Sequence, residues 1–124
     1  MKKIFLLFVV STLLTGCTAA TAEVGVLSST EAYELIKEDP TVVVVDVRSA
    51  EEFASGHIEG AILIPADQIK AQAEAILLDK DATILVICRS GVRSQGASQL
   101  LVELGFSNIY DIGGILSWPG ELVE

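Results

Sequence analysis

Cysteine and histidine are scarce in this sequence, and their scarcity narrows the chemistry open to the protein. The 124 residues hold two cysteines, Cys17 and Cys88, one histidine and no C-x-x-C pair. Without two neighbouring thiols, a dithiol redox exchange within one chain is excluded. No group of His, Cys, Asp and Glu has metal-ligand spacing either, so we expect no metal and no other cofactor.

Positive charge is scarce as well. Eight Lys and Arg side chains stand against seventeen Asp and Glu, which gives a formal net charge of −9. A protein this acidic repels phosphate backbones, so nucleic acid is excluded as a partner. Two of the few basic residues, Arg89 and Arg93, nevertheless share one short segment. A locally positive segment on an acidic protein is typical of a functional site.

The apolar run at residues 4–14 is too short to span a membrane comfortably as a mature helix. It follows Lys2 and Lys3, and a positive start before a short apolar stretch indicates a secretory signal peptide. Loss of these two lysines would change the formal net charge from −9 to −11. The remainder is long enough for one domain with a buried core.

Two cleavage sites compete after the apolar run. Leu14-Thr15-Gly16-Cys17 resembles the lipobox of bacterial lipoproteins, in which the cysteine is lipidated and becomes the new N-terminus. Ala20-Thr21-Ala22 is an A-x-A site that would release a soluble protein beginning at Glu23. We favour the lipobox because it directly follows the apolar run.

This interpretation divides the chain into a signal peptide at residues 1–16, a spacer at 17–23 and one domain at 24–124. The protein would be exported to the cell envelope and anchored to the membrane through lipid on Cys17, facing the periplasm. Three acyl chains would exceed what stable anchoring requires. Cleavage after Ala22 would instead give a soluble periplasmic protein.

The segment around Cys88 carries the chemistry. A buried strand is predicted at residues 83–87 and a helix at 96–105, and the run between them begins Cys88-Arg89-Ser90-Gly91-Val92-Arg93-Ser94. A strand, a tight turn and a helix start form a cradle in which successive backbone N–H groups converge on an anion. A thiolate at the head of that cradle would be stabilised by these groups and by Arg89 and Arg93. Cys88 has no partner thiol once Cys17 is lipidated or removed, so it is either a buried bystander or a nucleophile. Its position at a strand end before a glycine-containing turn favours the nucleophile.

The rest of the domain predicts an α/β fold. Strands are expected at 24–27, 41–47, 61–65, 83–87 and 107–110. Helices are expected after the capping boxes that begin at Ser28 and Ser49, and at 67–78 and 96–105. Strands that alternate with helices form a parallel sheet covered on both faces, and such sheets bind ligands at the carboxyl ends of their strands. Cys88 lies at such an end.

Several short motifs, taken in order, make the chain similar to the single-domain rhodaneses. They are Asp46-Val47-Arg48, Glu52-Phe53, Gly56-His57-Ile58-Glu59-Gly60-Ala61, Ile64-Pro65, the segment Cys88–Ser94, and Gly113-Gly114 with Trp118. The resemblance runs from about Val26 to Trp118 and implies a rhodanese-like, parallel five-stranded sheet with helices on both faces. It also implies a thiosulfate sulfurtransferase-like activity.

The resemblance assigns roles to named residues. Cys88 would accept sulfane sulfur from thiosulfate or a persulfide and pass it to cyanide or a thiol acceptor. The backbone amides from Arg89 to Ser94 would hold the terminal sulfur. Arg89 would attract the anionic donor, and Arg93 would brace the loop or bind that donor. Asp46, Arg48 and His57 would support neighbouring segments.

Two other functions stay open at this point. Phosphatases with a C-x5-R loop hold a tetrahedral oxyanion, but Cys88 to Arg93 is C-x4-R, and a smaller ring suits a single sulfur atom better. Phosphatase chemistry also needs an acid to protonate the leaving oxygen, and the sequence predicts none near the loop. The second alternative is a non-catalytic module of the cell envelope that binds a partner or delivers sulfur from Cys88.

Overall fold

The computed structural model describes residues 22–124. The predicted signal peptide, both cleavage sites and Cys17 therefore lie outside the described residues, except for Ala22 and Glu23. The elements in chain order are β1 (Gly25–Val26), α1 (Ser29–Glu38), β2 (Val43–Asp46), α2 (Ala50–Ala54), β3 (Ile62–Leu63), the short 3-10 turn η2 (Ala66–Gln68), α3 (Ile69–Ile76), β4 (Thr83–Cys88), α4 (Val92–Glu103), β5 (Asn108–Gly114) and the turn η3 (Ile115–Ser117). No helix within the described part of the chain is long and apolar enough to cross a membrane.

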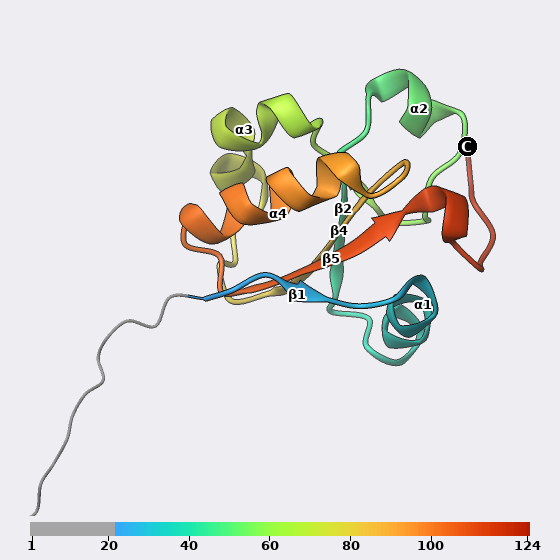
Figure 1. Ribbon diagram of the computed structural model, residues 1–124, viewed down its shortest axis with the longest axis horizontal. Helices are drawn as coiled ribbons and strands as arrows, with labels where there is room; N and C mark the ends of the chain where they lie inside the picture. Colours follow the sequence, from blue (N-terminus) through green and yellow to red (C-terminus); the bar gives the residue numbers. More distant parts are fainter. Residues whose placement is uncertain (1–21) are drawn as a thin grey trace, which may run out of the picture.

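The five strands form one sheet in the order β1-β5-β4-β2-β3, and every neighbouring pair is parallel. Parallel strands place all their carboxyl ends at the same edge of the sheet. β4 lies at the centre, so the loop that follows Cys88 emerges between the ends of its neighbours β5 and β2 (Figure 1). The predicted five-stranded parallel sheet is confirmed.

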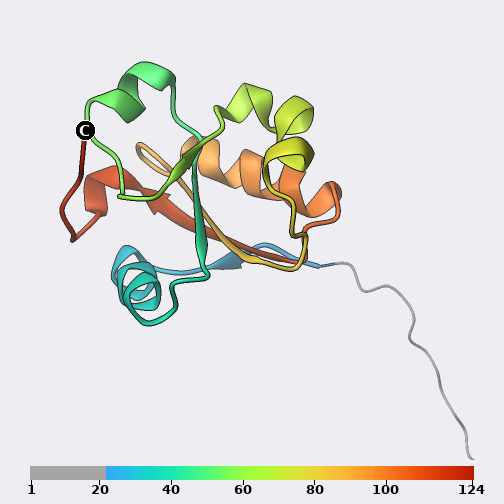
Figure 2. The ribbon, with the colours of Figure 1, turned by 180° about the vertical axis from the view of Figure 1, so that it is seen from behind.

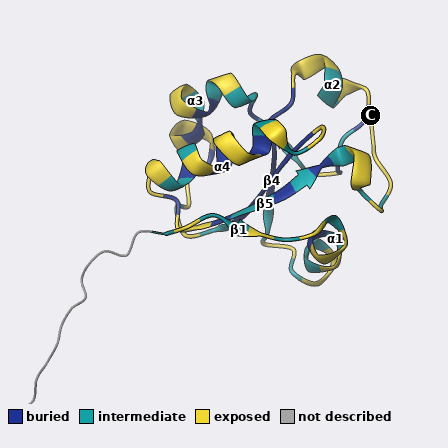
Figure 3. Cartoon of the chain, in the orientation of Figure 1, coloured by how far each residue is buried: buried dark blue, intermediate teal, exposed yellow. Residues whose placement is uncertain are grey.

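Helices cover both faces of the sheet. α3 and α4 lie on one face and α1 on the other, as the front and back views show (Figures 1 and 2). One core cluster combines side chains of α3 and α4 with one side of β2 and β4, including Ile69, Leu101 and Val86. The other cluster joins Ala32 of α1 to Leu85 and Ile112. The central strands are thus buried on both sides (Figure 3), which explains their β-branched, uninterrupted sequences.

Capping residues fix where the first two helices begin. Ser28 accepts a hydrogen bond from the Glu31 amide and the Glu31 carboxylate accepts one from the Ser28 amide, so the predicted capping box of α1 is present. Ser49 and Glu52 make the same pair of bonds at the start of α2. Each box satisfies two backbone N–H groups that have no partner within the helix.

Two predicted boundaries were wrong by four residues, whereas the other predicted strand and helix ends lie within two residues of those observed. α4 begins at Val92 rather than at residue 96, because the chain turns into the helix at Gly91, in a left-handed conformation with φ of 102°. β5 continues to Gly114 rather than ending at residue 110, because its second half pairs with the end of β4. The register between these strands shifts between Val86 and Cys88, so that Cys88 lies opposite Gly114. Irregularities of this kind are common beside active sites.

Gly114 is required by the close approach of β5 to the loop after β4. A Cβ atom added at Gly114 would lie 2.7 Å from Cα of Ser90 and still closer to the Arg89 carbonyl. Gly96, on the exposed side of α4, has no atom within 4 Å of the same position.

We predict that Gly114→Ala lowers the free energy of unfolding by at least about 2 kcal/mol, because the added methyl group overpacks rigid backbone. Gly96→Ala is the matched control and should raise it by about 0.5–1 kcal/mol, as expected for glycine in a helix interior. Chemical denaturation of both variants measures the two changes. Equal stability of the two variants would contradict the close approach.

Candidate functional site

Cys88 is the last residue of β4 and is fully buried. Its Sγ accepts hydrogen bonds from the backbone amides of Gly91, at 3.0 Å, and of Ser94, at 3.3 Å. Two N–H donors that point at one sulfur form the kind of backbone arrangement that binds an anionic atom. The cradle predicted from the sequence is therefore present, and two of its amides already point at Sγ itself.

The cradle is built from a three-residue loop and the first turn of α4. The loop comprises Arg89 to Gly91, and Val92, Arg93 and Ser94 are helical. The loop is shorter than the sequence predicted, because the helix was expected to begin only at residue 96. The first N–H groups of a helix have no partner within it, so the early start of α4 turns the Ser94 amide into a donor to Cys88. α4 is twelve residues long, and its N-terminus adds a partial positive charge beside the sulfur.

Ser94 is held in place by Asp111 of β5. The Ser94 hydroxyl lies 2.7 Å from Oδ1 of Asp111, and 3.1 Å from the Gly91 carbonyl oxygen. The same Oδ1 accepts a hydrogen bond from the Gly113 amide at 3.0 Å. Asp111 thus joins β5 to the start of α4. Sequence reasoning missed Asp111, although its position just before Gly113-Gly114 could have indicated it.

Arg93 forms a bidentate ion pair with Glu52 of α2. Nη1 and Nη2 of Arg93 donate to Oε1 and Oε2 of Glu52 at 2.8 and 3.0 Å. In the sequence, Glu52 stood out only as part of the motif Glu52-Phe53. In the structure its carboxylate makes two contacts, because it binds Arg93 and also accepts a hydrogen bond from the Ser49 amide at the start of α2. The sequence left two roles open for Arg93, bracing the loop or binding the donor. This ion pair is consistent with bracing the loop.

The ion pair shifts the pKa values of both partners. Hydrogen bonds from Arg93 and from the Ser49 amide lower the pKa of Glu52 from 4.5 to about 2. The hydrogen bond to Glu52, and to a smaller extent the charges of Glu52, Cys88 and Asp46, raise the pKa of Arg93. Glu52 is therefore ionised throughout the physiological pH range.

Asp46 and Arg48 form a second, buried ion pair after β2. Arg48 donates from Nε and Nη2 to the Asp46 carboxylate, with the shortest distance at 2.8 Å, and from Nη2 to the Gly56 carbonyl at 2.7 Å. The pair joins the end of β2 to the end of α2. This location suits the supporting role expected for both residues.

His57 follows α2 in the chain and contacts Phe53 and Val123. Its Nδ1 is 2.8 Å from the Phe53 carbonyl, and its ring stacks on the Phe53 ring with centroids 3.7 Å apart. Its backbone forms an isolated antiparallel bridge with Val123, near the C-terminus. These contacts tie the C-terminal segment to the α2–β3 connection.

Three of the predicted loop residues have side chains exposed to solvent. Arg89, Ser90 and Val92 are exposed, and Val92 keeps 76% of its accessible surface. Within residues 22–124, the Arg89 side chain has no carboxylate partner. Arg89 is thus placed where an anion in solution would meet it, as its predicted role requires.

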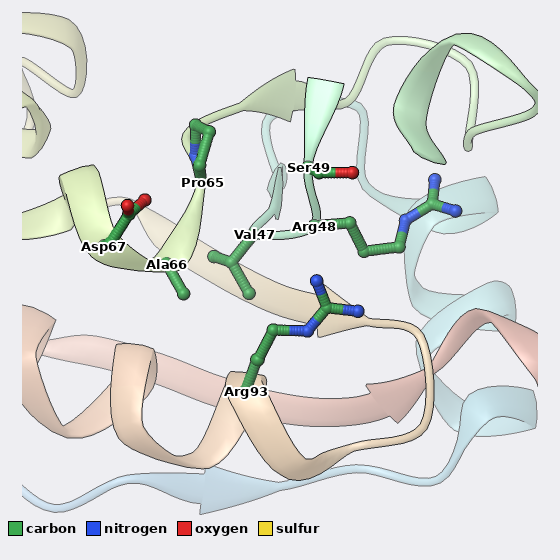
Figure 4. A pocket seen from close by; sticks show the side chains of 7 residues that line it. All are labelled: Val47, Arg48, Ser49, Pro65, Ala66, Asp67 and Arg93. Atoms are coloured by element: carbon green, nitrogen blue, oxygen red, sulfur yellow. The ribbon is translucent and has the colours of Figure 1, made fainter. Parts of the chain in front are cut away.

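A pocket of about 260 Å³ opens beside the loop (Figure 4). It lies between the segment Pro65–Asp67 and Arg93, with Val47 between them, whereas the Arg48 side chain points to the opposite side from Asp67 (Figure 4). Cys88 is not among its lining residues. Ser49 completes the lining.

The sequence identified no acid near the loop that could protonate a leaving oxygen, and the structure places two carboxylates there. Glu52 and Asp111 both contact residues of the loop or of the first turn of α4, from elements distant in the sequence. Glu52 nevertheless cannot serve a phosphatase as the general acid, because with a pKa of about 2 it holds no proton at neutral pH. No cluster suited to hold a metal occurs in the part of the chain that the structure describes.

We predict that Glu52→Gln removes a pH-dependent stabilisation. Because the folded-state pKa of Glu52 lies below its ordinary value of 4.5, its stabilisation is complete above about pH 4.5 and lost as the pH falls towards 2. Arg93 is 39% exposed, so solvent screening limits the contribution to about 1 kcal/mol. Urea denaturation from pH 7 to 2.5 should show the two proteins converging. Glu51→Gln is the control, and a constant difference for Glu52→Gln across this range would refute the prediction.

Comparison with known proteins agrees with this geometry. Residues 28–121 match the family described as Rhodanese-like domain. The Bacillus subtilis (strain 168) protein named "Putative sulfurtransferase YtwF" is 37% identical over 99 residues, which cover 80% of this chain and 94% of that protein. A tRNA uridine(34) hydroxylase of Sodalis glossinidius is 34% identical over 102 residues, which cover 78% of this chain but 29% of the hydroxylase.

The fold agrees with that of solved structures. The crystal structure of a rhodanese-related protein from Thermoplasma volcanium superimposes with a TM-score of 0.70 at 30% identity, over 80% of this chain and 97% of that one. The family match at residues 28–121 includes β2, β4 and the whole cradle around Cys88. The chain belongs to the rhodanese-like domain family.

Proposed function

We propose that the protein is a sulfurtransferase that carries sulfane sulfur as a persulfide on Cys88. The observation that supports this most strongly is the pair of backbone N–H groups, from Gly91 and Ser94, directed at the Cys88 sulfur. A persulfide is an anion, and fixed N–H donors at a helix start stabilise an anion without a metal. The nucleophile needs no proton relay, because thiolate is itself the attacking species.

The reaction proceeds in two balanced steps. The Cys88 thiolate attacks the sulfane sulfur of the donor, a new S–S bond forms and the bond between that sulfur and its carrier breaks. With thiosulfate, the leaving group is sulfite and Cys88 becomes a persulfide. A nucleophilic acceptor, cyanide or a thiol, then takes the terminal sulfur, and the electron pair of the S–S bond returns to Cys88.

Thiosulfate or a persulfide is the donor we propose, and cyanide or a thiol is the acceptor. The sulfurtransferase name of the Bacillus relative, which this chain covers almost end to end, supports sulfur transfer. The hydroxylase relative is about three times longer than the matched segment, so family membership alone does not assign the acceptor.

We predict that the full-length protein transfers sulfur from thiosulfate to cyanide and that Cys88→Ser abolishes the transfer. Incubation with thiosulfate should also increase the intact mass of the wild type by one sulfur atom, and leave Cys88→Ser unchanged. Thiocyanate formation and mass spectrometry provide the two readouts. A wild type that gains no sulfur and makes no thiocyanate would favour the alternative, a rhodanese-fold module that only binds a partner.

We also propose that the protein is exported and anchored to the cell envelope through lipid on Cys17. The support is the sequence alone: Leu14-Thr15-Gly16-Cys17 directly follows the apolar run. β1 begins at Gly25, so at least seven residues separate the lipidated cysteine from the fold. That spacer gives the domain room to stand clear of a membrane surface.

We predict that Cys17→Ser leaves the protein uncleaved or soluble when it is expressed in a bacterium with a lipoprotein pathway. Ala22→Gln is the matched control, because it removes the A-x-A site and should leave a mature, membrane-bound product. Fractionation and mass measurement of the N-terminus distinguish the two sites. A mature membrane-bound product from Cys17→Ser would contradict lipid anchoring at this residue.

A further inference from the structure

The charges around Cys88 are largely cancelled. Arg48 is paired with Asp46 in a buried, doubly hydrogen-bonded contact. Arg93 is paired with Glu52 through two hydrogen bonds of 2.8 and 3.0 Å. Neither guanidinium is free to neutralise a bound anion without losing its carboxylate partner.

A third carboxylate contacts the first turn of α4. Asp111 holds Ser94, whose amide contacts the Cys88 sulfur. Three arginines, counting Arg89, are thus set against three carboxylates, Asp46, Glu52 and Asp111, so these side chains sum to no net charge. Sequence reasoning noted the two arginines of the loop but did not place Glu52 and Asp111 beside them, because these carboxylates come from other elements.

The backbone supplies what positive potential the site has. The two amides on Cys88 and the N-terminus of α4 act on one sulfur atom. Such dipoles suit one negative charge, that of the thiolate or of the persulfide. Two of the loop amides are already engaged by Sγ, so the charge that a donor adds meets the remaining loop amides and Arg89, the one arginine of the loop and its surroundings without a carboxylate partner in residues 22–124.

We propose that Glu52 is a specificity-determining residue that disfavours dianionic sulfur donors and selects donors with a single negative charge, such as an alkyl persulfide. This rests on the proposed function of Cys88. Glu52 acts in two ways: it adds a negative charge beside the loop, and it occupies both donor groups of Arg93 that a sulfonate oxygen would use. A dianion experiences twice the repulsion that a monoanion does.

The test compares two donors that react by the same chemistry. Thiosulfate carries two negative charges and leaves as sulfite, whereas benzenethiosulfonate carries one and leaves as benzenesulfinate. Both transfer one sulfur atom to the Cys88 thiolate. The second-order rate constant for persulfide formation would be measured for the full-length wild type, Glu52→Gln and Glu51→Gln at low ionic strength.

Glutamine at position 52 keeps an oxygen that caps α2 and removes the charge. We expect Glu52→Gln to raise the rate constant with thiosulfate by roughly five- to tenfold and that with benzenethiosulfonate by roughly two- to threefold, because the repulsion that is removed scales with the charge of the donor. Added salt should shrink both gains. Glu51→Gln, which loses the same charge from an exposed position without an Arg93 contact, should change both by less than about twofold.

The other outcomes are distinct. Equal losses with both donors would show that Glu52 only braces Arg93 and would overturn the proposal, as would equal gains. If Glu51→Gln raised the rate constants as much as Glu52→Gln does, the cause would be the overall charge of the protein and not the position of Glu52. That result would also overturn the proposal. A wild type that takes up sulfur from neither donor would overturn the proposed function itself, and the role of Glu52 with it.

Discussion

The hydrogen bonds from two backbone amides to the Cys88 sulfur are the interaction on which the rest of the site depends. They exist only if the chain leaves β4, reverses at Gly91 and enters α4 within three residues. Gly91 provides the left-handed conformation that this reversal needs, and Gly114 allows β5 to pass against the loop. A small set of backbone requirements therefore determines where the reactive atom lies.

The side chains around the cradle mainly connect the start of α4 to neighbouring elements of the fold. Arg93 reaches from α4 to Glu52 of α2, and Ser94 reaches to Asp111 of β5. Both contacts join segments that are far apart in sequence and meet at the carboxyl edge of the sheet. Because each contact places a carboxylate beside a residue of the first turn of α4, mechanical support and the proposed selection of the donor would depend on the same side chains.

Much of this architecture follows from local sequence signals. The capping boxes at Ser28 and Ser49 act within four residues, and the apolar run before Cys88 has no alternative to a buried strand, so these elements were predicted correctly. The partners of Ser94 and Arg93 were not predicted, because they lie 17 and 41 residues away. The early start of α4 was missed because Val92, Arg93 and Ser94 carry no helix-capping signal of their own; the cap is a glycine with positive φ.

The bridge between His57 and Val123 makes the end of this sequence part of the support for the site. Leu122 lies against Gly56, whose carbonyl receives the hydrogen bond from Arg48, and Arg48 in turn fixes the end of β2. An affinity tag fused directly after Glu124 would begin two residues after Val123, the bridged residue. A purification strategy that leaves residues 121–124 free, or separates them from the tag with a flexible spacer, therefore preserves the bridge between Val123 and His57, which holds the α2–β3 connection.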